Sequence, residues 1–308
     1  FSPEHGLFGE ADAGEKVTYS ESNLNLPEVI SLYGKTRKPS IEMLEGIDLI
    51  LYDIQDIGAR FYTYITTLGL VMESAGELGI SVIVLDRPNP IRGDIIEGPI
   101  LNLDYQTFVG YYPIPIRYGG TVGDLGNKII QEKWISPLPE LEIIDMEGWK
   151  NNLWFDETDL PWVKPSPNIP DLETAIIYPG MCIIEGTNLS EGRGTQNPFK
   201  LIGAPWVDGK LLSQKLNKYK LPGVVFKPVL FTPISIPGMS TYPKFQDEKC
   251  AGIEIVIIDR NNYNSVNTGI VTLFTLYSMY SENITFKEKH LNRLWGSDQL
   301  LKEIKKGT

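Results

Sequence analysis

The sequence predicts an α/β protein with a Rossmann-like parallel-sheet domain and a second, smaller domain of mixed α+β structure. Two apolar runs of strand length, at residues 47–53 and 80–86, have the composition of buried parallel strands. Between them, apolar residues recur every three or four positions over residues 65–78, which is typical of one face of a helix. Strand, helix and strand in this order form a βαβ unit.

The same alternation continues to about residue 146. Thr121, followed three residues later by Asp124, predicts a capping box that opens a helix. Residues 141–146 then have the composition of a further strand. A proline-rich connection at residues 161–170 leads into segments that we predict to be helices at 172–184, 208–219 and 269–280 and strands at 223–231 and 252–259. We therefore predict two domains, residues 1–146 and residues 147–308.

Both ends of the chain resemble the interior of a longer protein. The sequence opens on a loop at Phe1 that reads as the continuation of a strand, and it closes on a basic amphipathic helix at residues 300–306. We expect the first strand–helix unit of the sheet and any targeting signal to lie outside this chain, and the family resemblance described below implies the same for a final helix.

The composition disfavours several classes of protein. With 28 Lys and Arg against 39 Asp and Glu, the net charge of −11 disfavours binding to nucleic acid or to anionic lipid. No apolar run approaches the roughly 18 residues of a membrane-spanning helix. Two distant cysteines, Cys182 and Cys250, and two histidines, His5 and His290, offer little for a metal centre. We predict buried unpaired cysteines, with a single disulfide as the alternative, and we predict no metal, no cofactor and acid–base chemistry based on carboxylates.

Polar side chains follow both predicted parallel strands. Ligands of open α/β sheets collect at the carboxyl ends of such strands. The candidates for a substrate-binding crevice there are Asp53, Gln55, Asp56, Arg60, Tyr62, Asp86, Arg87 and Asn89. The structural alternative is that Asp53 and Asp86 only cap the turns that follow them, and a metal site built from Asp53, Asp86 and His5 is a minor alternative.

Two further segments carry reactive side chains. Glu4 and His5 lie in the tight loop between Pro3 and Gly6, where such a pair is usually solvated. Residues 185–195 combine three glycines with hydroxyl, amide and charged groups suited to sugar hydroxyls, but they have no phosphate-binding glycine pattern. The candidates in this loop are Glu185, Asn188, Glu191 and Arg193, and the alternative is a polar surface turn.

Several long blocks together carry a family likeness. They are PEHGLFGE (3–10), YDIQDIGARFYTYITT (52–67), LDRPNP (85–90), EGP (97–99), FVGYYPIPIRYGGTVGDL (108–125), PWVKPSPNIP (161–170) and EGTNLSEGRGTQNPF (185–199). In this order they resemble the exo-β-N-acetylmuramidase family of bacterial peptidoglycan hydrolases. The resemblance implies a Rossmann-like domain, a smaller second domain that closes the active cleft, and Glu4 as the catalytic residue.

The resemblance also implies the substrate and the location. Members of the family release terminal N-acetylmuramic acid from the non-reducing end of peptidoglycan fragments, so muropeptides or disaccharides are the expected partners, in an extracytoplasmic compartment of a bacterium. The alternative is a non-catalytic protein that binds peptidoglycan or another carbohydrate. A nucleotide-dependent enzyme is a third option, which the missing phosphate loop disfavours.

Glycoside hydrolysis requires an acid for the leaving oxygen and a second group that attacks or activates water. We predict Glu4 as the acid, with His5 orienting it or sharing its proton. The candidates for the second group are Glu185, Glu191, Asp53, Asp56 and the acetamido oxygen of the substrate. The lactyl carboxylate of muramic acid calls for a cation, for which the candidates are Arg60, Arg87 and Arg193.

Overall fold

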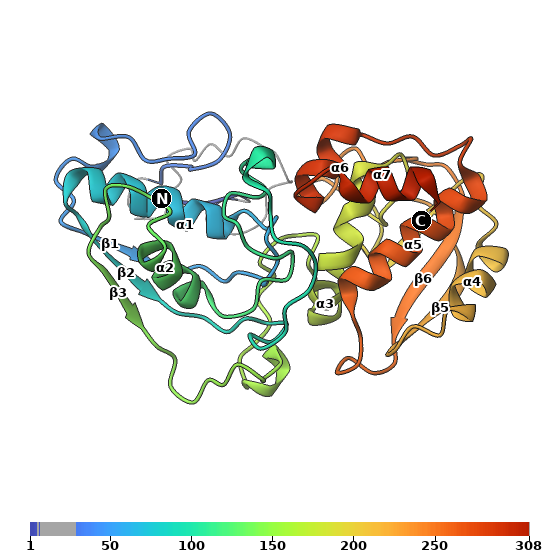
Figure 1. The fold of residues 1–308 in the computed structure, drawn as a ribbon, viewed down its shortest axis with the longest axis horizontal. Helices are drawn as coiled ribbons and strands as arrows, with labels where there is room; N and C mark the ends of the chain where they lie inside the picture. The colour runs from blue at the N-terminus through green and yellow to red at the C-terminus, as the bar shows by residue number, and fades with distance from the viewer. Residues whose placement is uncertain (5, 7–28, 308) are drawn as a thin grey trace. The chain divides into compact units, whose positions relative to one another are not determined.

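The computed structural model describes residues 1–4, 6 and 29–307, which form two compact units (Figure 1). Unit 1 consists of Phe1–Ile95 and Tyr118–Pro167, and unit 2 consists of Ile96–Arg117 and Asn168–Thr308. His5 lies outside the described residues. The single domain boundary predicted at residue 146 differs from this division, because the chain leaves unit 1 at residue 96 and returns to it before entering unit 2 for good.

Backbone hydrogen bonds explain the two exchanged segments. Glu97 and Arg117 pair through both of their backbone N–H groups, at 3.1 and 3.0 Å, and so close residues 96–117 into a loop. The N–H of Asn102 then donates to the carbonyl of Gly296 in unit 2. Residues 147–167 stay with unit 1, where the carbonyl of Asn151 accepts the N–H of Gly93 at 2.7 Å.

Unit 1 is built on a three-stranded parallel sheet in the order β1-β2-β3. The strands are β1 (Leu49–Tyr52), β2 (Ser81–Leu85) and β3 (Leu141–Ile144). In register, Leu49 lies opposite Ser81 and Val82 lies opposite Leu141. The predicted parallel strands are therefore confirmed, and their carboxyl ends meet at one edge of the sheet.

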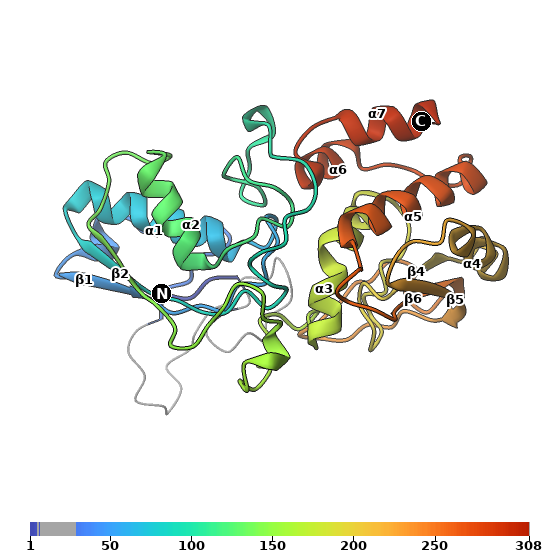
Figure 2. The same cartoon turned by 60° about the horizontal axis from the view of Figure 1, so that its bottom comes forward.

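Two helices cover one face of this sheet, as Figure 2 shows. They are α1 (Tyr64–Leu78) and α2 (Val122–Gln131). The predicted capping box is confirmed, because the side chain of Thr121 accepts the N–H of Asp124 while the carboxylate of Asp124 accepts the N–H of Thr121. The expectation that β1 is buried on both faces is wrong: Leu49 and Leu51 are 44% and 60% exposed, since both described helices pack on the opposite face.

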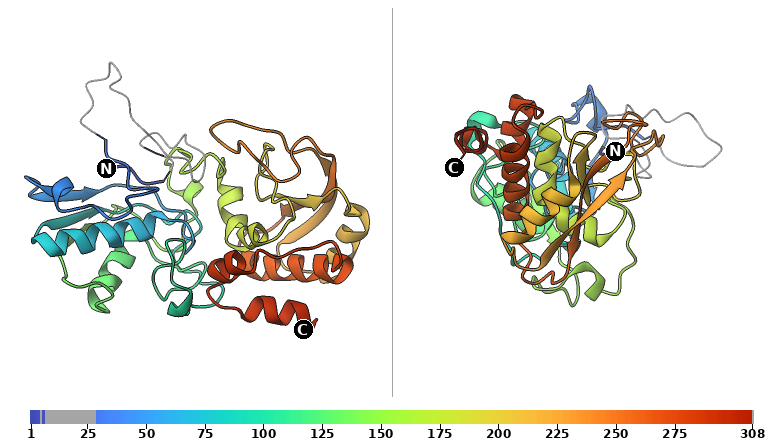
Figure 3. Two further views of the ribbon diagram at one scale, coloured as in Figure 1. Left: turned by 90° about the horizontal axis from the view of Figure 1, so that it is seen from above. Right: turned by 90° about the vertical axis from the view of Figure 1, so that its right-hand side faces the viewer.

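Unit 2 is the mixed α+β domain that the sequence predicts (Figure 3). Its antiparallel sheet has the order β4-β6-β5, and α4 packs against β5 and β6. The strands are β4 (Leu201–Ala204), β5 (Val224–Phe231) and β6 (Cys250–Ile257). The helices are α3 (Leu172–Met181), α4 (Gly209–Lys218), α5 (Ser265–Tyr280), α6 (Glu288–Trp295) and α7 (Gln299–Lys306).

Close packing of α3 on α5 depends on two glycines. A Cβ atom added to Gly269 would lie 2.3 Å from the carbonyl oxygen of Gly180, so only glycine allows this approach. The two cysteines, Cys182 and Cys250, are buried and unpaired, as predicted. None of the helices in the described part of the chain has the length and apolar character needed to cross a membrane.

Candidate active site

A cavity of about 630 Å³ opens in unit 1 where β1 and β2 end. Its lining includes Asp53 and Gln55 after β1, Arg87 after β2, and Tyr64 at the start of α1. Pro3 and Gly6, on either side of the Glu4–His5 pair, also line it. The polar crevice expected at the strand ends is therefore present in unit 1.

The loops after β1 and β2 are held together by two polar contacts. The Nε of Arg87 donates to Asp53 Oδ1 at 2.6 Å, and both side chains are half-exposed at the cavity. The Nε2 of Gln55 donates to the backbone carbonyl of Pro88 at 2.8 Å. These contacts hold the guanidinium of Arg87 in place across the strand ends.

Glu4 follows Pro3, which lines the same cavity, and is contacted by three hydroxyl groups. The Oγ1 of Thr63 donates to Glu4 Oε2 at 2.7 Å, and the hydroxyl of Tyr64 contacts the backbone carbonyl of Glu4 at 3.2 Å. The hydroxyl of Tyr33 also hydrogen-bonds the Glu4 side chain, and burial together with the Glu4 charge raises the pKa of Tyr33. The carboxyl that the sequence predicts to be catalytic is thus oriented by Thr63 and Tyr33, which come from two segments of the chain.

Tyr64 links the backbone of Glu4 to the proline-rich segment. Its hydroxyl donates to the carbonyl of Pro165 at 2.7 Å, within the proline-rich segment. Its ring packs edge to face with that of Tyr62, with a centroid distance of 4.7 Å, and Tyr62 also hydrogen-bonds it. Tyr62 is buried, so it supports Tyr64 rather than offering a face to a ligand.

Asp56 and Arg60, both predicted to bind substrate, are buried beneath the loop after β1. Asp56 Oδ2 accepts the hydroxyl of Tyr118 at 2.6 Å and the N–H of Gly58 at 2.7 Å. Burial raises the pKa of Asp56 to about 7, against these hydrogen bonds, which lower it. Burial also lowers the pKa of Arg60 to about 10. Neither residue is among the described residues that line the cavity, and their substrate-binding role stays a prediction.

We expect the Asp56→Asn substitution to change the pH dependence of stability. The Asp56 carboxyl titrates near pH 7 when folded and near 3.8 when unfolded, so the folded state keeps a proton that the unfolded state releases. The wild type should lose stability relative to the variant as pH rises from about 4 to 7, by on the order of 3 kcal/mol. Urea unfolding of both proteins from pH 4 to 8 measures this, and a constant difference would contradict it.

Asp86 and Asn89 make structural contacts, as the turn-capping alternative for Asp86 expects, and their substrate-binding role stays a prediction. Asp86 accepts the hydroxyl of Thr121 at 2.5 Å and the N–H of Gly123 at 2.8 Å, and so anchors the start of α2. Both polar atoms of the Asn89 side chain are hydrogen-bonded. The Nδ2 donates to the carbonyl of Gly120 at 2.7 Å, and the Oδ1 accepts the N–H of Ile91 at 3.1 Å.

The charged residues of the loop 185–195 form an ion-pair network inside unit 2. Arg193 Nη2 lies 2.7 Å from Glu185 Oε1, and Arg193 Nε lies 3.6 Å from Glu191 Oε1. Lys244 Nζ lies 2.8 Å from Glu191 Oε2, and His290 Nε2 lies 3.6 Å from Glu185 Oε2. Burial alone would raise the pKa of Glu185, but the charge of Arg193, with His290, outweighs it and lowers the pKa to about 2.

This network gives Glu185 and Glu191 cationic partners that neutralise them. An ionised, doubly paired carboxylate is suited to holding a loop rather than to donating a proton. Asn188 also holds the loop. Its side-chain amide donates to the carbonyl of Asn283 and accepts the N–H of Thr285, both at 2.9 Å. The catalytic role predicted for the two glutamates stays a prediction.

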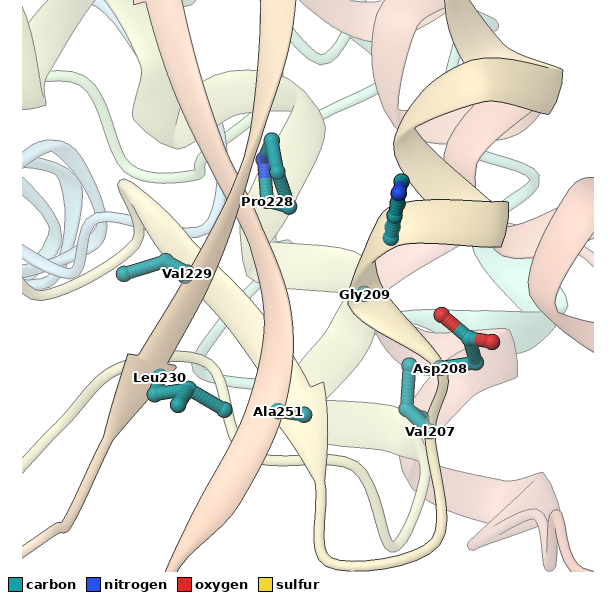
Figure 4. A pocket seen from close by; sticks show the side chains of 8 residues that line it. Val207, Asp208, Gly209, Pro228, Val229, Leu230 and Ala251 are labelled. Atoms are coloured by element: carbon teal, nitrogen blue, oxygen red, sulfur yellow. The ribbon is translucent and has the colours of Figure 1, made fainter.

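A second cavity, of about 370 Å³, lies in unit 2 beside the start of α4 (Figure 4). Its walls are mainly apolar, with Val207, Pro228 and Val229 among them. Its one carboxylate, Asp208, accepts the N–H of Leu211 and caps α4. Among the described residues that line it, this cavity therefore has no pair of carboxylates. In the part of the chain that the structure describes, no three side chains of His, Cys, Asp or Glu converge on a possible metal site.

Several side chains of the site were not singled out from the sequence. Thr63, Tyr64 and Lys164 stand inside blocks that carry the family likeness, so a signal for them existed. His290 and Lys244 reach the loop 185–195 from distant segments. Tyr33 has no local pattern that predicts its contact with Glu4.

The fold and this site define a class of protein, a two-unit α/β enzyme with a carboxylate at a cavity beside the ends of parallel strands. The model of the family described as exo-β-N-acetylmuramidase NamZ matches the chain in two parts, N-terminal at residues 1–173 and C-terminal at residues 176–308. The chain belongs to this family of glycosidases, which confirms the resemblance seen in the sequence.

Relatives span the whole chain. The peptidoglycan β-N-acetylmuramidase NamZ of Bacillus subtilis strain 168 is 44% identical over 310 residues, which cover 100% of this chain and 72% of that protein. A solved structure of a DUF1343 family protein from Bacteroides fragilis is 35% identical with a TM-score of 0.89, covering 98% of this chain and 77% of that one. A second such structure from the same organism is 30% identical with a TM-score of 0.74, and the match covers 94% of this chain and 74% of that one.

Proposed function

We propose that this protein is an exo-acting glycoside hydrolase that removes terminal N-acetylmuramic acid from the non-reducing end of peptidoglycan fragments. The observation that carries the proposal is the full-length similarity to a peptidoglycan β-N-acetylmuramidase, at 44% identity. The cavity in unit 1 supports it, because Pro3 and Gly6 on either side of Glu4–His5, and Tyr64 in contact with Glu4, line a space large enough for a sugar ring.

In the proposed reaction Glu4 protonates the oxygen that leaves with the rest of the glycan. Protonation of this oxygen lowers the barrier because it avoids expulsion of an alkoxide. Thr63 and Tyr33 hold the carboxyl, and Tyr64 fixes the backbone that carries it. The positioning of Glu4 is therefore built into the folded protein before substrate binds.

Peptidoglycan lies outside the cytoplasmic membrane, so we place the protein there, in cell-wall turnover. The proposed substrate also fits the composition. An acidic chain of net charge −11 does not attract anionic polymers over its whole surface, so it needs cations gathered at the site itself.

Release of the sugar separates catalysis from binding. Peptidoglycan fragments that end in N-acetylmuramic acid are incubated with the protein, and the products are identified by mass spectrometry. We expect free N-acetylmuramic acid together with a glycan shortened by one residue. Binding of the fragments with no release of sugar would contradict the proposal, and so would cleavage within long glycans without release of the terminal sugar.

A further inference from the structure

The cavity of unit 1 carries cationic side chains in an acidic protein. Among the described residues that line it, the charged side chains are two cations, Arg87 and Lys164, and one carboxylate, Asp53. These cations can attract an acidic group on a ligand, although the chain as a whole carries a net charge of −11.

Arg87 is held by Asp53, and the described residues leave one edge of its guanidinium without a hydrogen bond. Its backbone N–H donates to Asp86 Oδ1 at 3.0 Å, and Pro88 restricts the backbone that follows. Its Nε donates to Asp53 at 2.6 Å, while the described residues place no hydrogen bond on its Nη atoms. A guanidinium oriented in this way presents the Nη donors that carboxylates bind.

Lys164 lies in the proline-rich segment 161–170, whose neighbouring residues are held by contacts with other segments. The next residue, Pro165, accepts the hydroxyl of Tyr64, and Trp162 packs edge to face on Phe155 with a centroid distance of 5.1 Å. Lys164 is exposed and makes no ion pair with a described residue. No described residue therefore competes with a ligand for its ammonium.

We propose that Arg87, oriented by Asp53, binds the lactyl carboxylate of N-acetylmuramic acid, with Lys164 as a second, weaker cationic contact. This inference rests on the proposed function and names the residue that distinguishes muramic acid from glucosamine, which has no such carboxylate. The other two arginines considered from the sequence are placed differently: Arg60 is buried outside the cavity lining, and Arg193 is paired with two glutamates.

The test removes the carboxylate from the ligand and the cation from the protein separately. Calorimetry measures the affinity for N-acetylmuramic acid and for its lactyl methyl ester. We expect the wild type to prefer the free acid by about 10- to 30-fold, the size of a half-exposed charge-assisted contact. In Arg87→Gln this preference should fall to about twofold or less, and Lys164→Gln should reduce it by about two- to fivefold.

Two control variants exclude indirect effects. Lys150→Gln removes an exposed cation that does not line the cavity, and it should keep the preference of the wild type. The double variant Asp53→Asn/Arg87→Gln removes the carboxylate that Arg87→Gln leaves unpaired. If the double variant regained the preference for the acid, repulsion by Asp53 would explain the loss and the inference would be wrong.

The outcomes also separate this inference from the proposed function. An unchanged preference in Arg87→Gln, or equal affinity of the wild type for acid and ester, overturns the inference even if the protein releases N-acetylmuramic acid. Conversely, a preference that disappears in Arg87→Gln supports the inference even if no sugar is released, and in that case only the proposed hydrolysis fails.

Discussion

Glu4→Gln should lower kcat/KM for a disaccharide ending in N-acetylmuramic acid by about 10²- to 10⁴-fold, while the protein stays folded. Glutamine keeps the shape of the side chain and can still accept the hydrogen bond from Thr63, but it has no proton to give the leaving oxygen. Initial rates on the disaccharide measure the loss, and circular dichroism checks the fold.

The leaving group shows whether Glu4 acts as the acid. The 2,4-dinitrophenyl glycoside of N-acetylmuramic acid has a leaving group, dinitrophenolate, that departs without protonation. Glu4→Gln should therefore lose much less activity on this glycoside than on the disaccharide. Equal losses on both substrates would assign Glu4 another role. As a matched control, Glu132→Gln at the exposed end of α2 should keep the activity of the wild type on both.

Arg117→Met should destabilise the protein by about 3–5 kcal/mol, because it leaves a buried carboxylate without its charge partner. Arg117 Nη1 lies 2.6 Å from Glu97 Oε1, and both side chains are at most 2% exposed. The other carboxylate oxygen accepts the N–H of Val266 in the first turn of α5 at 2.9 Å. Urea unfolding measures the loss.

Two further variants test whether burial of the ion pair causes the loss of stability expected for Arg117→Met. Lys38→Met breaks partly exposed contacts with Glu73 and Glu77 and should cost less than about 1 kcal/mol. Glu97→Gln added to Arg117→Met should recover part of the stability, since a neutral amide can still accept the N–H of Val266. If Arg117→Met lowered the free energy of unfolding no more than Lys38→Met does, the buried pair of Arg117 and Glu97 would not stabilise the protein more than an exposed pair.

Much of the fold could be predicted because its signals are local. Continuous apolar runs marked β1 and β2, three- and four-residue spacing marked α1, and the pair of Thr121 and Asp124 marked the start of α2. These patterns follow from strand and helix periods, which act within a few residues. Placement of Asp53, Gln55 and Arg87 at one cavity followed from the same strands, since the polar residues come where the strands end.

The rest depended on contacts between distant segments. The identity of Asp86 does not reveal whether it binds a ligand or anchors α2, and only the approach of Thr121 and Gly123 decides this. The sequence alone does not show that Arg193 and His290 lie beside the carboxylate of Glu185. The assignment of residues 96–117 to unit 2 likewise rests on hydrogen bonds to residues far along the chain. Such pairings have no local sequence period.

A pair of isomeric disaccharides tests the proposed activity most directly. One has N-acetylmuramic acid β-linked to N-acetylglucosamine at the non-reducing end, and the other has the two sugars in the opposite order. An exo-acting N-acetylmuramidase should split the first into its two sugars and leave the second intact, as chromatography of the products would show. Cleavage of the second disaccharide at a comparable rate, or of neither, would contradict the proposed function.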